Sequence, residues 1–337
     1  MILAETRKGS ARSRKEILDE GVLSARRGGT RGMRKVVPRG LVSFLGGVIF
    51  AVASLSIGQQ MPIVHEPPLI LGQGFLQSLR QTNKQFNLDD DLCVRLLSDF
   101  GAVFLSHGTM SPPTYLFENE SSVDSFQAQL PRSDLADPKY PVELQRMAAE
   151  AMKASQEEAK RLALSITPAS KEAGRRSYAQ TVQLWESRVR HGIEHWAAAN
   201  RIQRDEGERL LALAPTGQVR EVLRLEARRI YFSKEFDKSI LYSVAAPGTS
   251  QHLSMLAMDV REHADTGIRA ILARHGWFQT VYSDLPHFTY LGVPETELPR
   301  LGLVSRENAG HTFWIVKTHK TRGAPPGEPD VVEECPF

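Results

Sequence analysis

The pattern of polar and apolar residues changes character along the chain. Between residues 141 and 232, apolar side chains are mixed with many Ala, Glu, Gln and Arg residues, which is typical of helices with one solvated face. Pro141 suits a first helical turn, and only Pro168 and Pro215 interrupt the stretch after it. We therefore expect helices over roughly 141–166, 170–202, 204–213 and 216–232.

Beyond residue 238 the apolar residues gather in short runs, a pattern that predicts strands. These runs cover 239–245, 255–260, 278–282, 287–291 and 312–316. A helix is expected over Thr266–His275, because Gly276 is the residue type that most often follows a helix end. A long helical region that precedes a small mixed unit with an antiparallel sheet predicts the α+β fold class.

The part before residue 141 is less regular. Prolines punctuate residues 59–73, which favours a linker. Residues 74–106 favour short helices, because the polar run Asn87–Asp90 supplies capping side chains ahead of helically spaced apolar residues. Residues 107–140 contain four prolines and favour loop, with one short helix near 121–129.

These changes divide the chain into five parts. The expected parts are a basic leader (1–58), an irregular and partly helical segment (59–140), a helical region (141–232), a compact α+β unit (233–321) and a disordered tail (322–337).

The leader has the layout of an export signal. An uncharged run, Gly40–Gly58, follows a basic flank, and Ala51 and Ala53 provide the small residues that a signal peptidase requires. The run is also nearly long enough to cross a bilayer, so an uncleaved membrane anchor is the alternative, and a buried helix a further one. Export or anchoring would place the remainder outside the cytoplasm. Met33 is the expected true start, since the order of basic flank and apolar run begins there.

Charge and cysteine content argue against two classes of function, nucleic-acid binding and zinc binding through cysteines. Residues 1–53 hold 11 Lys and Arg against 4 Asp and Glu, whereas the rest holds 31 basic and 35 acidic residues. The folded part therefore lacks the basic balance of a nucleic-acid-binding protein. Cys93 and Cys335 are the only cysteines and form no C-x-x-C motif, which argues against a cysteine-ligated zinc site. Whether the two pair is left open.

Two segments carry the residue types of a metal-dependent hydrolase. His252 and Asp259 are seven residues apart, on a path that can bring them together through a turn. His287 lies in a second segment, with Asp284 three residues before it. Two imidazoles and a carboxylate are a common ligand set for catalytic Zn²⁺, and they leave one position open for water. A nearby carboxylate can then act as the general base.

At these residues the chain resembles the zinc D-alanyl-D-alanine carboxypeptidases and dipeptidases (VanY- and VanX-like), which are related to murein endopeptidase and the hedgehog fold. The matching residues, over about 239–292, are Ser250, His252, Ala257, Asp259, Asp284 and His287. The resemblance implies a Zn²⁺ cofactor held by His252, Asp259 and His287, with Asp284 as the catalytic base and Ser250 at the substrate. It also implies hydrolysis of peptidoglycan stem peptides in the bacterial cell envelope.

The chain departs from the family pattern at two positions. Met255 stands where the family has a glycine after the first histidine, and Asp284 stands where it has a glutamate. The shorter arm of Asp284 changes its reach by about one methylene, and small displacements of a catalytic base cost rate. The family also has an arginine upstream for the substrate carboxylate, for which Arg228 and Arg229 are candidates by position.

Other patterns give competing interpretations. The motif His191-Gly-Ile-Glu-His195 has the spacing of inverted zincins, but a match on an ordinary amphipathic helix is the alternative. His311 could replace His287 as third ligand. For the whole protein, the alternatives to an exported zinc peptidase are a wall-binding or regulatory module with little or no turnover, and an unrelated helical envelope protein. Oligomeric state is left open.

Overall fold

The computed structural model describes residues 68–137, 139–321 and 332–334. Contacts divide the chain into two units, Met1–Gly58 and Gln59–Phe337, and all the described residues belong to the second. The expected leader, its cleavage site and Cys335 lie outside the described residues. No helix in the described part combines the length and the apolar character needed to cross a membrane.

Eight α-helices and four small antiparallel sheets make up the described part, which confirms the α+β class. The helices are α1 (Gln73–Gln81), α2 (Asp91–Phe100), α3 (Glu120–Ala128), α4 (Arg146–Arg161), α5 (Tyr178–Ala198), α6 (Arg204–Ala212), α7 (Pro215–Glu226) and α8 (Thr266–Arg274). The strands are β1 (Leu69–Leu71), β2 (Arg132–Leu135), β3 (Val142–Gln145), β4 (Ala257–Asp259), β5 (Trp277–Phe278), β6 (His287–Tyr290), β7 (Leu303–Asn308), β8 (His311–Val316), β9 (Thr318–Thr321) and β10 (Val332–Glu334).

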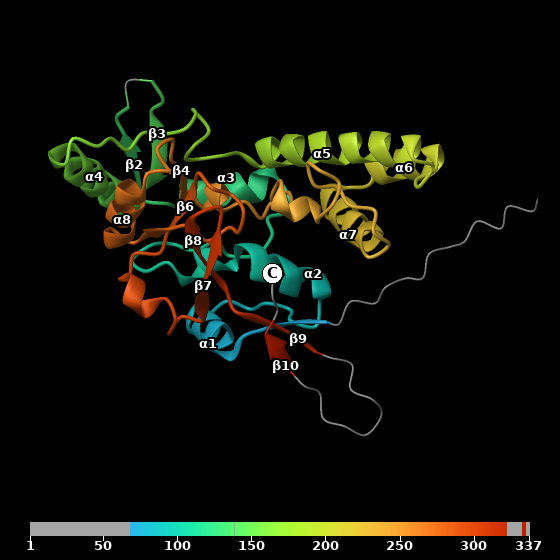
Figure 1. The fold of residues 1–337 in the computed structure, drawn as a ribbon, viewed down its shortest axis with the longest axis horizontal. Helices are drawn as coiled ribbons and strands as arrows, with labels where there is room; N and C mark the ends of the chain where they lie inside the picture. Colours follow the sequence, from blue (N-terminus) through green and yellow to red (C-terminus); the bar gives the residue numbers. More distant parts are fainter. Residues whose placement is uncertain (1–67, 138, 322–331, 335–337) are drawn as a thin grey trace, which may run out of the picture. The chain divides into compact units, whose positions relative to one another are not determined.

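The sheets are small and connect distant parts of the chain. Their strand orders are β1-β9-β10, β2-β3, β4-β6-β5 and β7-β8. Strand β1 lies in the segment that was expected to be a linker, and β10 lies in the tail that was expected to be disordered. Both pair with β9, so the two ends of the described chain meet in one sheet (Figure 1).

Short helices are present in the first part, and α2 is capped by one of the expected side chains. The Asp90 side chain accepts a hydrogen bond from the Leu92 N–H and so caps α2. Helix α3 corresponds to the short helix expected near 121–129, and it begins with a capping box between Asn119 and Ser122.

The helical region is shorter than expected at its beginning. Residues 142–145 form strand β3 and pair with β2, whose residues were expected to be loop. Val142 and Leu144 are buried and Glu143 between them is not, and this period of two outweighs the helix-forming composition. Residues 170–177 are not helical either, because the Ser177 side chain caps α5 in a capping box with Gln180.

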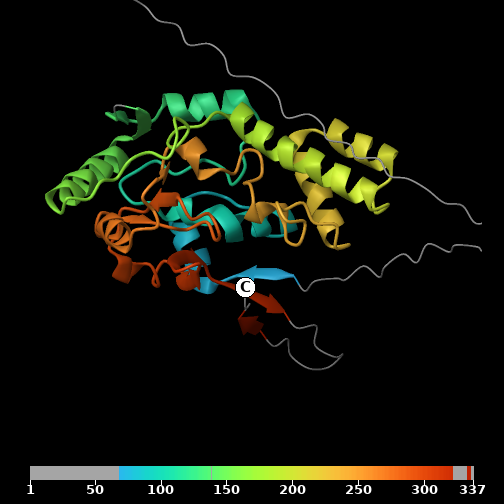
Figure 2. The same cartoon turned by 45° about the horizontal axis from the view of Figure 1, so that its top comes forward.

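Two hydrophobic cores separate the helices of this region. Helices α5 and α7 pack around Trp185 and Val222 in a core that also takes Leu96 of α2. Helix α4 instead packs with α8 and strands β4 and β6, for example through Met152 and Phe288. Figures 1 and 2 show α5, α6 and α7 together at one side of this unit and α4 and α8 at the other. The region thus packs on the α+β unit in both cores.

The sheet β4-β6-β5 is the element that positions the candidate ligands. Its register pairs Ala257 with Thr289, Met258 with Phe288 and Asp259 with His287. The expected helix at 266–275 and the expected strand at 312–316 are confirmed as α8 and β8. Strand β7, which pairs with β8, was not expected.

The strand expected at 239–245 is wrong. Residues Ile240–Tyr242 form a 3-10 helix instead, capped by the Ser239 side chain. The Ile240 N–H donates to the buried Glu226 carboxylate at 2.6 Å, so a side chain takes the hydrogen bond that a neighbouring strand would have taken.

Candidate metal centre

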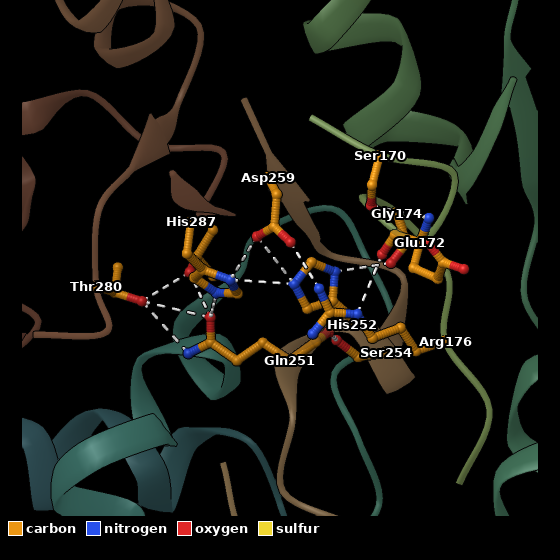
Figure 3. Close-up of polar contacts among 11 residues, drawn as sticks. Ser170, Glu172, Gly174, Arg176, Gln251, His252, Ser254, Asp259, Thr280 and His287 are labelled. Atoms are coloured by element: carbon orange, nitrogen blue, oxygen red, sulfur yellow. Dashed lines mark hydrogen bonds and ion pairs between the residues drawn. The ribbon is translucent and has the colours of Figure 1, made fainter. Parts of the chain in front are cut away.

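The strand register and one tight turn bring three predicted ligands together. Asp259 and His287 are directly opposite each other in the β4-β6 pair. His252 lies in a 3-10 helix, Gln251–Ser254, which ends at Met255. Met255 has a φ of 59°, in the left-handed region, and this reversal turns the chain into β4. Figure 3 shows Asp259 facing the two imidazole rings.

The left-handed turn at position 255 is a conformation that glycine adopts more readily than methionine. A left-handed conformation costs a residue with a side chain about 1–2 kcal/mol, but costs glycine little. In this chain the Met255 side chain is fully buried, in a cluster with Leu253, Phe117 and Phe126. Burial of the methionine side chain offsets the backbone cost.

Three ligand atoms form a nearly equilateral triangle. The Nε2 of His252 is 3.1 Å from the Nδ1 of His287 and 3.2 Å from the Oδ1 of Asp259. The third side, from His287 Nδ1 to Asp259 Oδ1, is 3.3 Å. A tetrahedral ion with bonds of about 2.0–2.1 Å separates its ligand atoms by about 3.3–3.4 Å, so the triangle is close to the size that zinc requires.

His252 turns its N–H away from the triangle. Its Nδ1 is 2.7 Å from the carbonyl oxygen of Gly174, and a carbonyl can only accept. The proton of the neutral ring is therefore on Nδ1, and Nε2 presents a lone pair. Burial lowers the pKa of His252 to about 4, so the ring is neutral at physiological pH.

His287 is arranged in the same way with its nitrogens exchanged. Its Nε2 lies 2.9 Å from the Oε1 of Gln251, which leaves Nδ1 facing the triangle. Asp259 has one oxygen in the triangle, and its Oδ2 accepts a hydrogen bond of 2.6 Å from Arg176.

The three facing atoms are thus all acceptors. Two imidazole lone pairs and a carboxylate oxygen at this separation repel one another unless a cation lies between them. Within the described residues, His252, Asp259 and His287 are also the only group of three metal-ligating side chains that converge in this way. These residues can hold a metal ion.

The triangle opens into a cavity of about 300 Å³. Helix α5, the segment 241–245 and the turn 281–284 form its walls, and His252 and His287 are among its lining residues. Ser250 and Asp284, the residues predicted for substrate and base, line the same cavity. All five predicted site residues therefore lie at or next to one recess.

The carboxylate of Asp284 lines this cavity and has no hydrogen-bond or ion-pair partner within the described residues. Its backbone carbonyl accepts from the His287 N–H at 3.2 Å. The side chain is open to the cavity, yet enclosure by the surrounding protein raises the pKa of this carboxyl. The preceding Ser283 has a φ of 75°, a strained conformation of the kind that gathers at functional sites.

The two candidate arginines for the substrate carboxylate lie away from the cavity. Arg228 pairs with Glu206 at 3.5 Å, and neither Arg228 nor Arg229 lines the cavity. Arg176 and Arg188 line it instead. Their sequence positions gave no signal, because both arginines lie within the helix expected over 170–202, among many other charged residues.

The competing histidines do not reach the triangle. His191 and His195 are exposed on α5, where the ring of His195 stacks on Phe236 at 3.9 Å. The Nδ1 of His311 faces the Oε1 of Gln279 at 3.1 Å, and its ring lies 5.5 Å from that of His263. The inverted-zincin motif and the alternative third ligand are therefore not part of this site.

Sequence reasoning missed the residues behind the ligands. Each candidate ligand has one such hydrogen-bond partner: Gly174 for His252, Arg176 for Asp259 and Gln251 for His287. Comparison with known proteins adds no further guide, since no family model, curated protein or solved structure matches the chain.

Proposed function

We propose that this chain is an exported zinc peptidase of the D-alanyl-D-alanine carboxypeptidase type, acting on peptidoglycan stem peptides outside the cytoplasm. The observation that carries the proposal is the triangle of three acceptor atoms at the inner end of an open cavity. The resemblance of the two ligand segments to that family supplies the substrate class. The basic and apolar leader in the sequence supports export.

Zinc fits this ligand set better than the other common divalent ions. Two imidazole nitrogens and one carboxylate oxygen are typical of catalytic zinc, whereas magnesium and calcium prefer oxygen ligands. When bound, zinc lowers the pKa of a coordinated water to about 7 and polarises a carbonyl oxygen of the substrate.

Asp284 is the proposed general base. Its carboxylate is free of hydrogen bonds within the described residues and faces the cavity that holds the ligands. It takes a proton from the attacking water and delivers it to the leaving amine. A raised pKa suits this work, since a base functions best when its pKa lies closer to the working pH.

Two arginines, Arg176 and Arg188, line the cavity, and we assign them different roles. Arg176 is committed to Asp259 and holds that ligand in place. Arg188 makes no ion pair within the described residues, and it lines the wall that α5 contributes. We assign Arg188 to the carboxylate of the substrate, because an arginine without a partner binds a carboxylate through two hydrogen bonds. Ser250, on the same cavity, is assigned to substrate binding.

A second candidate function has its own support. Asp284 in place of glutamate and Met255 in place of glycine are changes at a base and at a turn beside the ligands. They favour a wall-binding or regulatory module that retains the metal and has lost turnover.

Incubation of the full chain with purified muropeptides distinguishes the two functions. Release of D-alanine by the wild type, abolished in Asp284→Asn with zinc content unchanged, supports the peptidase. Zinc and muropeptide binding without any product from the wild type support the binding module.

A further inference from the structure

We infer that Gln251 is the positioning residue that commits His287 to binding the metal through Nδ1. This inference rests on the proposed metal site. It adds a residue outside the three candidate ligands, which decides which atom of His287 faces the metal position.

The orientation of the Gln251 amide follows from its surroundings. Its Nε2 is 3.0 Å from the carbonyl oxygen of Phe100, and only an N–H can satisfy that oxygen. The opposite assignment would place two acceptors in contact. The Oε1 atom is therefore the one that faces His287 Nε2 at 2.9 Å, and it accepts the imidazole proton.

Two threonines hold the amide in this orientation. Thr289 donates its hydroxyl proton to the Oε1 of Gln251. Thr280 and Thr289 are hydrogen-bonded at 2.7 Å, and the Nε2 of Gln251 lies 3.3 Å from the Thr280 hydroxyl. All three side chains are buried, with exposures of 3% or less. The two hydroxyl groups therefore surround the amide on the side away from Phe100, and Figure 3 shows Gln251 between Thr280 and His287.

The consequence is a fixed imidazole. A neutral histidine carries one N–H, and the hydrogen bond that holds this proton determines which nitrogen is free to bind a metal. With the proton on Nε2, the lone pair of Nδ1 points at the triangle. The same contact stops the ring from turning about its χ2 angle. Loss of such an outer hydrogen bond typically weakens metal binding about 10- to 100-fold.

Two other glutamines serve as controls for the structural disturbance that replacing Gln251 would cause. Gln127 and Gln145 are also buried, and both donate to the 3-10 helix Gln251–Ser254. Gln127 donates to the carbonyl oxygen of Leu253 at 3.0 Å, and Gln145 to that of Ser254 at 2.8 Å. Neither contacts a candidate metal ligand. Replacing one of them disturbs the segment that carries His252, but leaves the hydrogen bond to His287 intact.

The test compares metal affinity in the full chain and its variants. Zn²⁺ affinity is measured by competition with a chromogenic chelator, and the Co²⁺-substituted protein is followed by its visible absorption. Gln251→Met, which keeps the shape and removes the acceptor, is expected to bind Zn²⁺ about 10- to 100-fold more weakly and to show an altered Co²⁺ spectrum. Gln145→Met is expected to bind within threefold of the wild type, even where its melting temperature falls.

Two further variants keep the inference open to contradiction. Gln251→Glu, if protonated on the oxygen that faces the Phe100 carbonyl, still accepts the same imidazole proton and is expected to bind more tightly than Gln251→Met. Thr289→Val, which only loosens the amide, is expected to fall between Gln251→Met and the wild type. Equal affinity in the wild type and Gln251→Met, or an equal loss in Gln145→Met, would overturn the inference while leaving the metal site standing. Absence of zinc from the wild type overturns both.

Discussion

His287 lies directly opposite Asp259 in the β4-β6 pair, with its Nδ1 3.3 Å from the Asp259 Oδ1. Opposite residues of an antiparallel pair project on the same face of the sheet, so the register itself brings two ligands together. A slip of one residue would turn one of them to the other face. His252 then completes the triangle from the turn before β4. The pairing of β4 with β6 therefore sets the geometry of the site.

The role of Asp284 predicts opposite results for two substitutions. Asp284→Asn removes the base and is expected to lower kcat about 10²- to 10⁴-fold on a stem-peptide substrate, because general-base catalysis contributes rate on that scale. Asp284→Glu keeps a carboxylate with a longer arm and is expected to retain at least a tenth of the wild-type kcat. Both should keep the zinc content of the wild type. Equal turnover in Asp284→Asn and the wild type would show that Asp284 is not the base.

Arg188 is predicted to recognise a carboxylate. Arg188→Ala is expected to raise KM about 10- to 100-fold for a peptide with a free C-terminus, the range of a hydrogen bond between charged groups. A peptide amidated at the C-terminus should respond little to the substitution. Arg190→Ala is the matched control, since Arg190 is on the same helix and pairs with Glu186 at 3.6 Å. A similar change of KM for both peptides would contradict the assignment.

Met255 is predicted to be stabilising despite its backbone conformation. Met255→Gly relieves about 1–2 kcal/mol of left-handed strain, but empties a fully buried site whose loss costs about 2–5 kcal/mol. We therefore expect the free energy of unfolding in urea to fall by about 2 kcal/mol, the middle of the range that these two effects leave. A glycine variant more stable than the wild type would mean that the turn, and not the buried side chain, dominates at this position.

Glu226 is predicted to make stability depend on pH. Burial raises the pKa of its carboxyl from 4.5 to about 7 in the folded chain. Between these values the folded state keeps a proton that the unfolded state has lost, so the free energy of unfolding falls as pH rises from 4.5 to 7. Glu226→Gln stays neutral and still accepts from the Ile240 N–H, so its melting temperature should fall less over this range. Parallel pH profiles for both proteins would contradict this source of the dependence.

The convergence of the three candidate ligands could be predicted from the sequence, but the residues that support them could not. His252, Asp259 and His287 are carried by short apolar runs and a turn, which are local patterns. The outer contacts come from elsewhere in the chain: Gly174 lies 78 residues before His252, and Gln251 lies 36 residues before His287. Such contacts depend on tertiary packing, which no local pattern encodes.

The errors in the fold have the same origin. Residues 142–145 have the composition of a helix, and became a strand because β2 supplied a partner. Residues 239–245 have the composition of a strand, and became a 3-10 helix because Glu226 took the Ile240 N–H. In both places a tertiary hydrogen-bond partner outweighed local propensity.

Zinc content of the purified full chain is the most direct test of the metal site. After supplementation with Zn²⁺ and removal of free metal, elemental analysis should give one zinc per wild-type chain. His252→Ala should lose it, and His191→Ala, which changes an exposed histidine on α5, should keep it. A wild type that retains no zinc, or a His252→Ala variant that retains as much as the wild type, would contradict the account.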